Sequence, residues 1–185
     1  MLAESVVMII VGDEKGEPFA SGSGIAVHPD GYILTSWHVI DGGHAFGVRF
    51  ENDEKLYGGV ELIKYHPEFD LALIRIDRKL KPLPLYDGRR ELRRGEKVVA
   101  IGSPMGLFNS VSDGIISGFR KIKNNDMIQF TAPVSPGSSG GALLNCCGEI
   151  IGICLGGFDE GQNLNVAVSY KHIGSFASNI KLTSA

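Results

Sequence analysis

Short strand-like runs separated by turns recur along almost the whole chain. Turn signals from Gly, Pro, Asn and Asp appear roughly every ten residues, and the runs between them are rich in β-branched and aromatic residues. No long amphipathic helix interrupts this pattern, so about a dozen short strands predict an all-β barrel or sandwich. The predicted strands are 6–11, 23–28, 32–35, 45–50, 56–65, 71–76, 97–101, 111–119, 127–131, 142–144, 149–154 and 165–169.

One helix is predicted at the end of the chain, where Ser169 suits the N-cap of a segment from Tyr170 to about Ile180. Its apolar face would consist of Ile173, Phe176, Ala177 and Ile180. Residues 80–96 contain two prolines and many charges and show no strand pattern. This indicates an N-terminal barrel at 1–82, a linker at 83–96 and a C-terminal barrel at 97–185.

Composition and charge exclude several classes of partner. The net charge is -3 and there is no basic run, so nothing indicates binding to nucleic acid or to an anionic membrane. Charges of both signs are mixed within 87–96, which favours a solvated connection. No segment approaches the roughly 20 apolar residues of a membrane span. Because residues 1–11 lack a basic leader and a cleavage site, they predict a first strand and not a signal peptide.

The three cysteines, Cys146, Cys147 and Cys154, predict free thiols. Adjacent cysteines rarely form a bridge, and the spacing lacks the paired form of a zinc site. An odd number of cysteines without a framework favours a reducing compartment such as the cytoplasm. Removal of a leader would leave an extracytoplasmic location open.

The segment Pro136-Gly137-Ser138-Ser139-Gly140-Gly141 places hydroxyl groups within glycine-rich backbone. Such runs are more often plain turns or linkers. Here the glycines would let the N–H groups of Gly137, Ser138 and Ser139 turn toward one point beside the Ser139 hydroxyl. A serine nucleophile needs a base, and the attacked carbonyl needs donors for its developing negative charge. The segment therefore predicts Ser139 as a nucleophile and these three N–H groups as an oxyanion hole.

A histidine and an aspartate upstream suit the remaining roles. His38 follows the strand-like run 32–35, and Asp70 precedes the apolar run 71–76. Taken singly, His38 is better explained as a structural histidine, and Asp70 is equally well explained as a cap at the entry of a strand. A partly buried carboxylate needs a hydrogen-bond partner, however, and a histidine N–H is a suitable one. The chain order His38, Asp70, Ser139 is also one of the known orders of a catalytic triad.

The chain resembles the HtrA (high-temperature-requirement) serine proteases of the chymotrypsin-like superfamily over about residues 6 to 180. The motifs that carry the resemblance are Gly22-Ser23-Gly24-Ile25-Ala26, Asp30-Gly31-Tyr32-Ile33-Leu34-Thr35, His38-Val39, Asp70-Leu71-Ala72-Leu73-Ile74, Ala100-Ile101-Gly102-Ser103-Pro104, Val111-Ser112-Asp113-Gly114, Ile128-Gln129-Phe130-Thr131-Ala132-Pro133 and Gly137-Ser138-Ser139-Gly140-Gly141.

This resemblance implies two six-stranded β-barrels of chymotrypsin type with a short C-terminal helix. It also implies a serine endopeptidase that acts on unfolded or flexible polypeptides, with His38, Asp70 and Ser139 as its triad and no metal or organic cofactor. The residue six before the nucleophile, Pro133, would form the floor of the specificity pocket. Its walls would be Val134, Ile153, Cys154 and Leu155. Without a carboxylate at the floor, we expect a preference for small or medium aliphatic side chains, unless Asp159 or Glu160 reaches the pocket.

The sequence also departs from the family. Ser138, Ala142 and Trp37 replace the usual Asn, Pro and a small or amide residue, and no PDZ domain is expected after Ala185. Two rival functions stay open: a chaperone-like binding module with low or latent turnover, and a hydrolase of non-peptide esters. Family members form trimers through the start of the protease domain, which leaves a homo-oligomer open for this chain.

Overall fold

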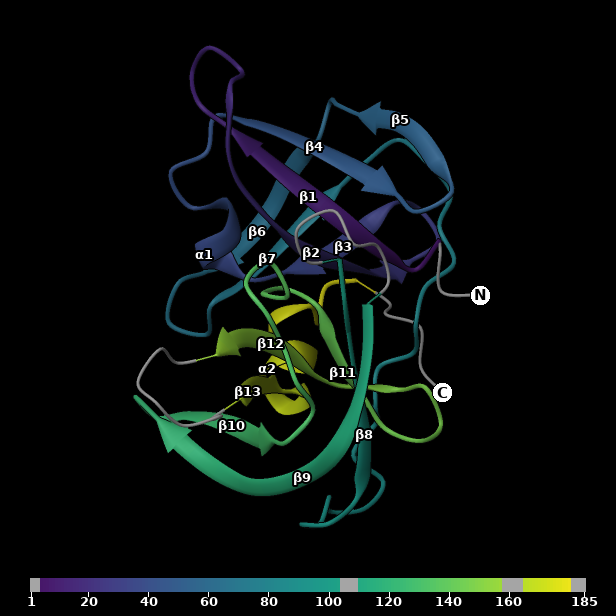
Figure 1. Cartoon of the computed structure of the whole chain (residues 1–185), viewed down its shortest axis with the longest axis vertical. Helices are drawn as coiled ribbons and strands as arrows, with labels where there is room; N and C mark the ends of the chain where they lie inside the picture. The colour runs from purple at the N-terminus through teal and green to yellow at the C-terminus, as the bar shows by residue number, and fades with distance from the viewer. Residues whose placement is uncertain (1–3, 104–109, 158–164, 181–185) are drawn as a thin grey trace.

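The computed structural model describes residues 4–103, 110–157 and 165–180. Figure 1 shows two β-rich halves, the N-terminal half above and the C-terminal half below, with a short helix tucked among the strands of the lower half. No helix within these residues is long and apolar enough to cross a membrane.

The N-terminal half is a seven-stranded antiparallel sheet with the strand order β5-β4-β1-β2-β3-β7-β6. Its strands are β1 (Val6–Gly12), β2 (Pro18–His28), β3 (Tyr32–Thr35), β4 (Ala45–Phe50), β5 (Asp53–Tyr57), β6 (Glu61–His66) and β7 (Leu71–Arg75). A one-turn helix, α1 (Trp37–Ile40), follows β3.

The two edge strands of this sheet, β5 and β6, are consecutive in the chain and are separated by residues 58–60 only. The sheet therefore curls around until its edges approach each other. The sequence predicts a single strand over 56–65, which the structure instead divides at Gly58 and Gly59. Gly59 has a φ of +64°, a backbone conformation that glycine adopts readily and that ends an extended strand.

The C-terminal half is a closed six-stranded barrel with the order β10-β13-β12-β11-β8-β9. Its strands are β8 (Lys97–Gly102), β9 (Ser110–Ile122), β10 (Asn125–Phe130), β11 (Ala142–Leu144), β12 (Ile150–Gly157) and β13 (Asn165–Ser169). The fold class, an all-β double barrel of chymotrypsin type, is confirmed; the N-terminal half differs in having seven strands because the predicted strand is divided.

Helix α2 (Tyr170–Phe176) begins as the sequence predicts. The Ser169 hydroxyl caps it by accepting a hydrogen bond from the N–H of Lys171, at 3.3 Å. The helix ends at Phe176, four residues before the predicted end. Ala177 is nevertheless buried in the hydrophobic core that also contains Phe176, and Ile180 packs against that core.

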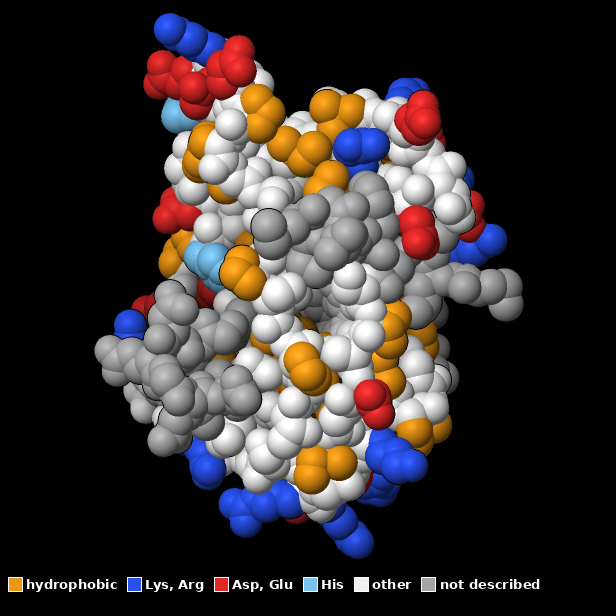
Figure 2. All heavy atoms as spheres, viewed as in Figure 1, with side chains coloured by type: hydrophobic (Ala, Val, Ile, Leu, Met, Phe, Trp, Pro, Cys, Tyr) orange, Lys and Arg blue, Asp and Glu red, His pale blue; other side chains and the backbone are white. Residues whose placement is uncertain are grey.

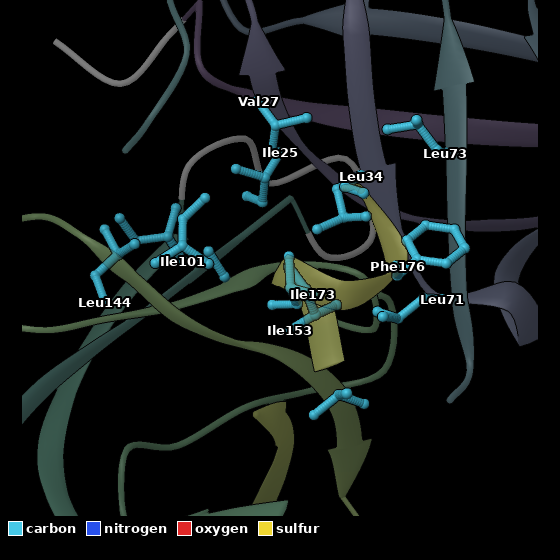
Figure 3. Packing of buried hydrophobic residues seen from close by; sticks show 14 of the residues in the cluster. Ile25, Val27, Leu34, Leu71, Leu73, Ile101, Leu144, Ile153, Ile173 and Phe176 are labelled. Carbon is cyan, nitrogen blue, oxygen red and sulfur yellow. The ribbon is translucent and has the colours of Figure 1, made fainter. Parts of the chain in front are cut away.

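One apolar core joins the two halves. Figure 3 shows Ile25, Leu34 and Leu71 of the upper sheet facing Ile153 of the lower barrel and Phe176 of α2. All of these side chains are at most 3% exposed. Separating the halves would expose them at about 1.5–3 kcal/mol for each large side chain, so this core holds the two halves in a fixed relation.

The predicted linker 83–96 is attached to the C-terminal barrel by its apolar residues, while most of its charged residues are exposed, as the sequence predicts. Leu85 forms a parallel bridge to Ile150, and the N–H of Tyr86 donates to the Ile150 carbonyl at 2.9 Å. Tyr86 and Leu92 are buried among barrel residues. These two apolar residues hold the segment down while its charged residues face solvent.

Arg89 in this segment forms a paired contact with Glu149, which is only 2% exposed. Its two terminal nitrogens donate to the two carboxylate oxygens at 2.9 and 2.6 Å, and Asn145 Nδ2 donates to Oε1 at 2.9 Å. The Arg89 hydrogen bonds lower the pKa of Glu149 below its ordinary value of 4.5. Glu149 therefore contributes stability above pH 4.5 that is lost as the pH falls through its lowered pKa.

We expect the substitution Arg89→Leu to lower the melting temperature at pH 7, because it leaves the buried Glu149 carboxylate without its cation. The deficit should shrink as the pH falls from 7 toward 3, through the lowered pKa of Glu149, because protonation of the carboxyl removes the charge that Arg89 compensates. Thermal unfolding followed by circular dichroism at the two pH values measures this. Adding Glu149→Leu should restore most of the loss at pH 7, and an equal deficit at both pH values would contradict the ion-pair explanation.

Candidate active site

His38 and Asp70 meet because their strands are neighbours. Strands β3 and β7 pair antiparallel with Thr35 opposite Ala72, so the residues after β3 and before β7 lie at the same end of the sheet. His38 Nδ1 and Asp70 Oδ2 are 2.5 Å apart, and the backbone N–H of His38 donates to Asp70 Oδ1 at 2.7 Å. Both carboxylate oxygens thus hold one histidine.

The backbone of Asp70 is held in an uncommon conformation. Its φ is +54°, in the left-handed region that non-glycine residues seldom occupy and that Asp tolerates better than most. The Asp70 carbonyl accepts the N–H of Trp37 at 3.1 Å, and the Asp70 N–H donates to Pro67 at 3.2 Å. These bonds place the carboxylate under α1, where it orients the imidazole through Nδ1 and leaves Nε2 for other partners.

Ser139 reaches this pair from the C-terminal barrel. Gly22 of β2 lies between them: a Cβ atom there would be 2.5 Å from Val39 Cγ1, next to His38, and 3.2 Å from the Ser139 carbonyl oxygen. The Ser139 hydroxyl donates to the Leu155 carbonyl at 3.0 Å. Within the described residues it makes no hydrogen bond to His38. The three predicted residues therefore gather at the junction of the halves, and the Ser139 hydroxyl has the Leu155 carbonyl as its hydrogen-bond partner.

The backbone N–H groups of this loop differ in their partners. The N–H of Ser138 donates to the Ser135 carbonyl at 2.9 Å, so it is taken up by the turn and is not free for an oxyanion hole, contrary to the sequence prediction. Among the described residues, the N–H groups of Gly137 and Ser139 have no acceptor. Two of the three predicted donors are left available.

A cavity of about 160 Å³ lies against the loop 135–141, which carries the predicted nucleophile Ser139 and is called the nucleophile loop below; Ser135 and Ser138 line the cavity. Three of the predicted pocket residues also line it: Pro133, Val134 and Cys154. Ile153 does not, because alternate residues of a strand face opposite ways and its side chain enters the core between the halves (Figure 3). Leu155 is not among the lining residues either; its side chain packs on that core and its carbonyl receives the Ser139 hydroxyl.

No charged side chain of the described residues lines this cavity. Asp159 and Glu160 lie outside the described residues. In Figure 2 charged side chains gather toward the upper and lower ends of this face. Within the described residues, no three His, Cys, Asp or Glu side chains are grouped to hold a metal ion.

The sequence marks Ser23 only as part of a motif, yet the structure places it against the nucleophile loop. It is fully buried on β2, and its hydroxyl donates to the Gly137 carbonyl at 2.7 Å. The signal that points to such a residue is a small polar side chain between two glycines in an otherwise apolar strand.

The three cysteines are free thiols, as the sequence predicts: Cys146 and Cys147 are exposed and Cys154 is buried. Burial raises the pKa of the Cys154 thiol from 9.0 to about 12, so it is protonated at neutral pH. Because the thiolate is the reactive form, Cys154 should be inert in the folded protein.

We expect iodoacetamide to modify Cys146 and Cys147 in the native protein and Cys154 only after unfolding. Peptide mass spectrometry before and after addition of denaturant identifies the alkylated residues. Rapid alkylation of Cys154 in the native protein would mean that the barrel opens there far more often than its burial indicates.

Comparison with known proteins gives concordant matches. The profile of the trypsin-like peptidase domain family matches residues 22–153. A probable periplasmic serine endoprotease, DegP-like, from Pseudomonas savastanoi pv. phaseolicola is 40% identical over 146 residues, which are 77% of this chain and 30% of that protein. Serine protease HTRA1 from Xenopus tropicalis is 44% identical over 145 residues, 74% of this chain and 31% of that protein.

Among solved structures, the serine endoprotease from Yersinia pestis is similar with a TM-score of 0.83 and 30% sequence identity. The match covers 96% of this chain and 62% of that one. The resemblance to HtrA-type protease domains is thus confirmed, and the chain spans about a third of the length of the curated relatives it matches. The periplasmic location in the relatives' name gives no support to the cytoplasmic location expected from the cysteines.

Proposed function

Because this chain belongs to the trypsin-like peptidase domain family, we propose that it is a serine endopeptidase acting on unfolded or flexible polypeptides. The observation that carries the proposal is the His38–Asp70 pair facing a loop that leaves two backbone donors free beside Ser139. A nucleophile, an oriented base and an oxyanion hole are the parts that acyl transfer requires. No cofactor is needed for any of them.

In the proposed mechanism, the Ser139 hydroxyl first rotates from the Leu155 carbonyl toward His38 Nε2. His38 takes the hydroxyl proton as Ser139 Oγ attacks the peptide carbonyl. Asp70 stabilises the resulting imidazolium through Nδ1–H. The carbonyl oxygen, now negative, is received by the N–H groups of Gly137 and Ser139.

His38 then gives the proton to the leaving amine, and the C–N bond breaks to leave an acyl group on Ser139. Water, deprotonated by His38, attacks this ester and releases the second product. The proton taken from Ser139 leaves with the amine, and the proton that His38 takes from water returns to Ser139. The enzyme is therefore back in its starting state.

The cavity lined by Pro133, Val134 and Cys154 supports a preference for small or medium aliphatic side chains at the cleaved bond. An apolar cavity of about 150 Å³ can hold a molecule the size of benzene, so the volume is sufficient. A carboxylate that would attract Arg or Lys is absent from the described lining. Each buried methylene discriminates by about 1–3 kcal/mol only, so the preference should be broad.

Digestion of a denatured protein and mass spectrometry of the fragments test this preference. We expect most cuts after Val, Ala, Ile or Leu. A majority of cuts after Arg or Lys would overturn the aliphatic assignment and would direct attention to Asp159 and Glu160.

The deciding experiment for the function is hydrolysis of denatured casein by the wild-type protein and by Ser139→Ala. Activity in the first and none in the second supports the proposal. Suppression of aggregation by both proteins without hydrolysis would favour a chaperone-like module. Cleavage of small esters without cleavage of casein would favour an esterase.

The name of the Pseudomonas relatives supports an extracytoplasmic site of action for this chain as well. A homo-oligomer, expected from the family, stays a prediction that sedimentation velocity of the purified protein would test.

A further inference from the structure

Ser23 uses all of its polar atoms at the junction of the two halves. It is 0% exposed. Its hydroxyl donates to the Gly137 carbonyl at 2.7 Å and accepts the N–H of Ser103 at 2.8 Å. Its backbone N–H donates to the Ser139 carbonyl at 2.8 Å, and its carbonyl accepts the Thr35 hydroxyl at 2.7 Å. One residue of the N-terminal sheet therefore holds two carbonyls of the nucleophile loop.

These bonds immobilise alternate peptide groups of the loop. The peptide group between Gly137 and Ser138 is held at its oxygen by Ser23 and at its nitrogen by Ser135. The group between Ser139 and Gly140 is held at its oxygen by Ser23 and at its nitrogen by the Cys154 carbonyl, 2.9 Å away. The donors that stay free, Gly137 N–H and Ser139 N–H, lie next to these fixed groups.

The loop needs such an anchor because glycine does not fix its own backbone. Gly137 has a φ of +91° and no side chain to restrict it. The Ser23 hydroxyl is the one side-chain donor that reaches the Gly137 carbonyl within the described residues. Ser23 belongs to the same sheet as His38. It therefore fixes the position of the Gly137 and Ser139 N–H groups relative to the imidazole.

We propose that Ser23 is a positioning residue for the oxyanion hole: its hydroxyl and N–H clamp the nucleophile loop so that Gly137 N–H and Ser139 N–H face the attacked carbonyl. This inference rests on the proposed peptidase activity. Ser23 touches neither the substrate nor the proton that moves. Its effect should appear in the turnover step, where the negative charge develops, and little in the binding of the uncharged substrate.

The test compares Ser23→Ala with Ser5→Ala, a matched loss of one hydroxyl. Ser5 is also buried, at 4% exposure, and its hydroxyl donates at 2.6 Å to the Lys81 carbonyl, away from the nucleophile loop. Both variants are assayed with a peptide substrate that the wild-type protein cleaves, below their measured unfolding temperatures. Affinity is measured in parallel for a peptide aldehyde, whose adduct carries the tetrahedral oxygen, and for a cleaved product peptide.

We expect Ser23→Ala to lower kcat about 10- to 100-fold with KM little changed, less than the roughly 100- to 1000-fold loss on removing an oxyanion donor outright. Aldehyde affinity should fall by a similar factor, while affinity for the product peptide should hold. Ser5→Ala should keep all three values near wild type, even if its melting temperature drops.

Wild-type kcat in Ser23→Ala, or a loss confined to KM, would overturn the inference. So would an equal loss in Ser5→Ala, which would indicate a general effect of destabilisation. If Ser23→Ala does not fold, Ser23→Cys replaces it, because a thiol fills the space but donates weakly. Failure of the proposed function is recognised separately: the wild-type protein would then cleave peptides no faster than Ser139→Ala.

Discussion

Replacing Ser139 with Ala should lower kcat by about 10⁴- to 10⁶-fold, and replacing His38 with Ala should lower it by a similar factor. The physical reason is that the hydroxyl is a poor nucleophile without a base, and the base has nothing to activate without the hydroxyl. The His38–Asp70 contact at 2.5 Å makes the imidazole part of the same unit. Steady-state hydrolysis of a peptide substrate measures the loss.

The double variant is the sharper test of this assignment. If Ser139 and His38 act as a unit, removing both should cost little more than removing either one. Matched controls are Ser21→Ala, at an exposed position of β2, and His44→Ala; the His44 side chain is 57% exposed. Multiplication of the two single losses in the double variant would show that the residues act independently, and so would contradict a shared proton-transfer step.

The predictable part of this structure is local. Short β-rich runs between turns predict the strands, and Ser169 before an apolar helical pattern predicts the start of α2, because both patterns depend on neighbours in sequence. The contact of His38 with Asp70 is also predicted, but from the need of a partly buried carboxylate for a hydrogen-bond partner and from the order of the triad, not from the pairing of β3 with β7 that produces it.

The part that could not be predicted depends on contacts between distant segments. The linker packs on the barrel because Tyr86 and Leu92 find partners there, although its charges favour solvation. The N–H of Ser138 is not available to the oxyanion hole because it donates a hydrogen bond to the Ser135 carbonyl. Ile153 does not line the pocket, because its position in β12 directs its side chain into the core between the halves. Strand or turn propensity carries none of this information.

The sequence predicts flexible backbone at the glycines of the nucleophile loop, but at Gly140 the structure shows a second requirement. Its φ is +86°. A Cβ atom there would lie 2.1 Å from the carbonyl oxygen of Ser23 and 2.4 Å from Thr35 Oγ1. The nucleophile loop therefore lies against β2 at a distance that only a residue without a side chain allows.

We expect Gly140→Ala to lower the free energy of unfolding by about 3–5 kcal/mol and to abolish hydrolysis. The left-handed backbone alone costs Ala about 1–2 kcal/mol, and the contact with a buried backbone oxygen adds the rest because a strand cannot move aside cheaply. Displacing the loop from Ser23 would also move Ser139 away from His38. Urea unfolding at equilibrium gives the stability, and hydrolysis of a peptide substrate gives the activity.

Gly16→Ala separates the two contributions. Gly16 has a φ of +78° and an exposed position in which a Cβ atom would meet nothing within 4 Å. The Gly16→Ala variant should lose only about 1–2 kcal/mol of unfolding free energy, the cost of the left-handed backbone, and should keep full activity. If Gly140→Ala were no more destabilising than Gly16→Ala and still cleaved peptides, the loop could leave β2 without loss. The close approach of the two halves would then not be what holds the nucleophile in place.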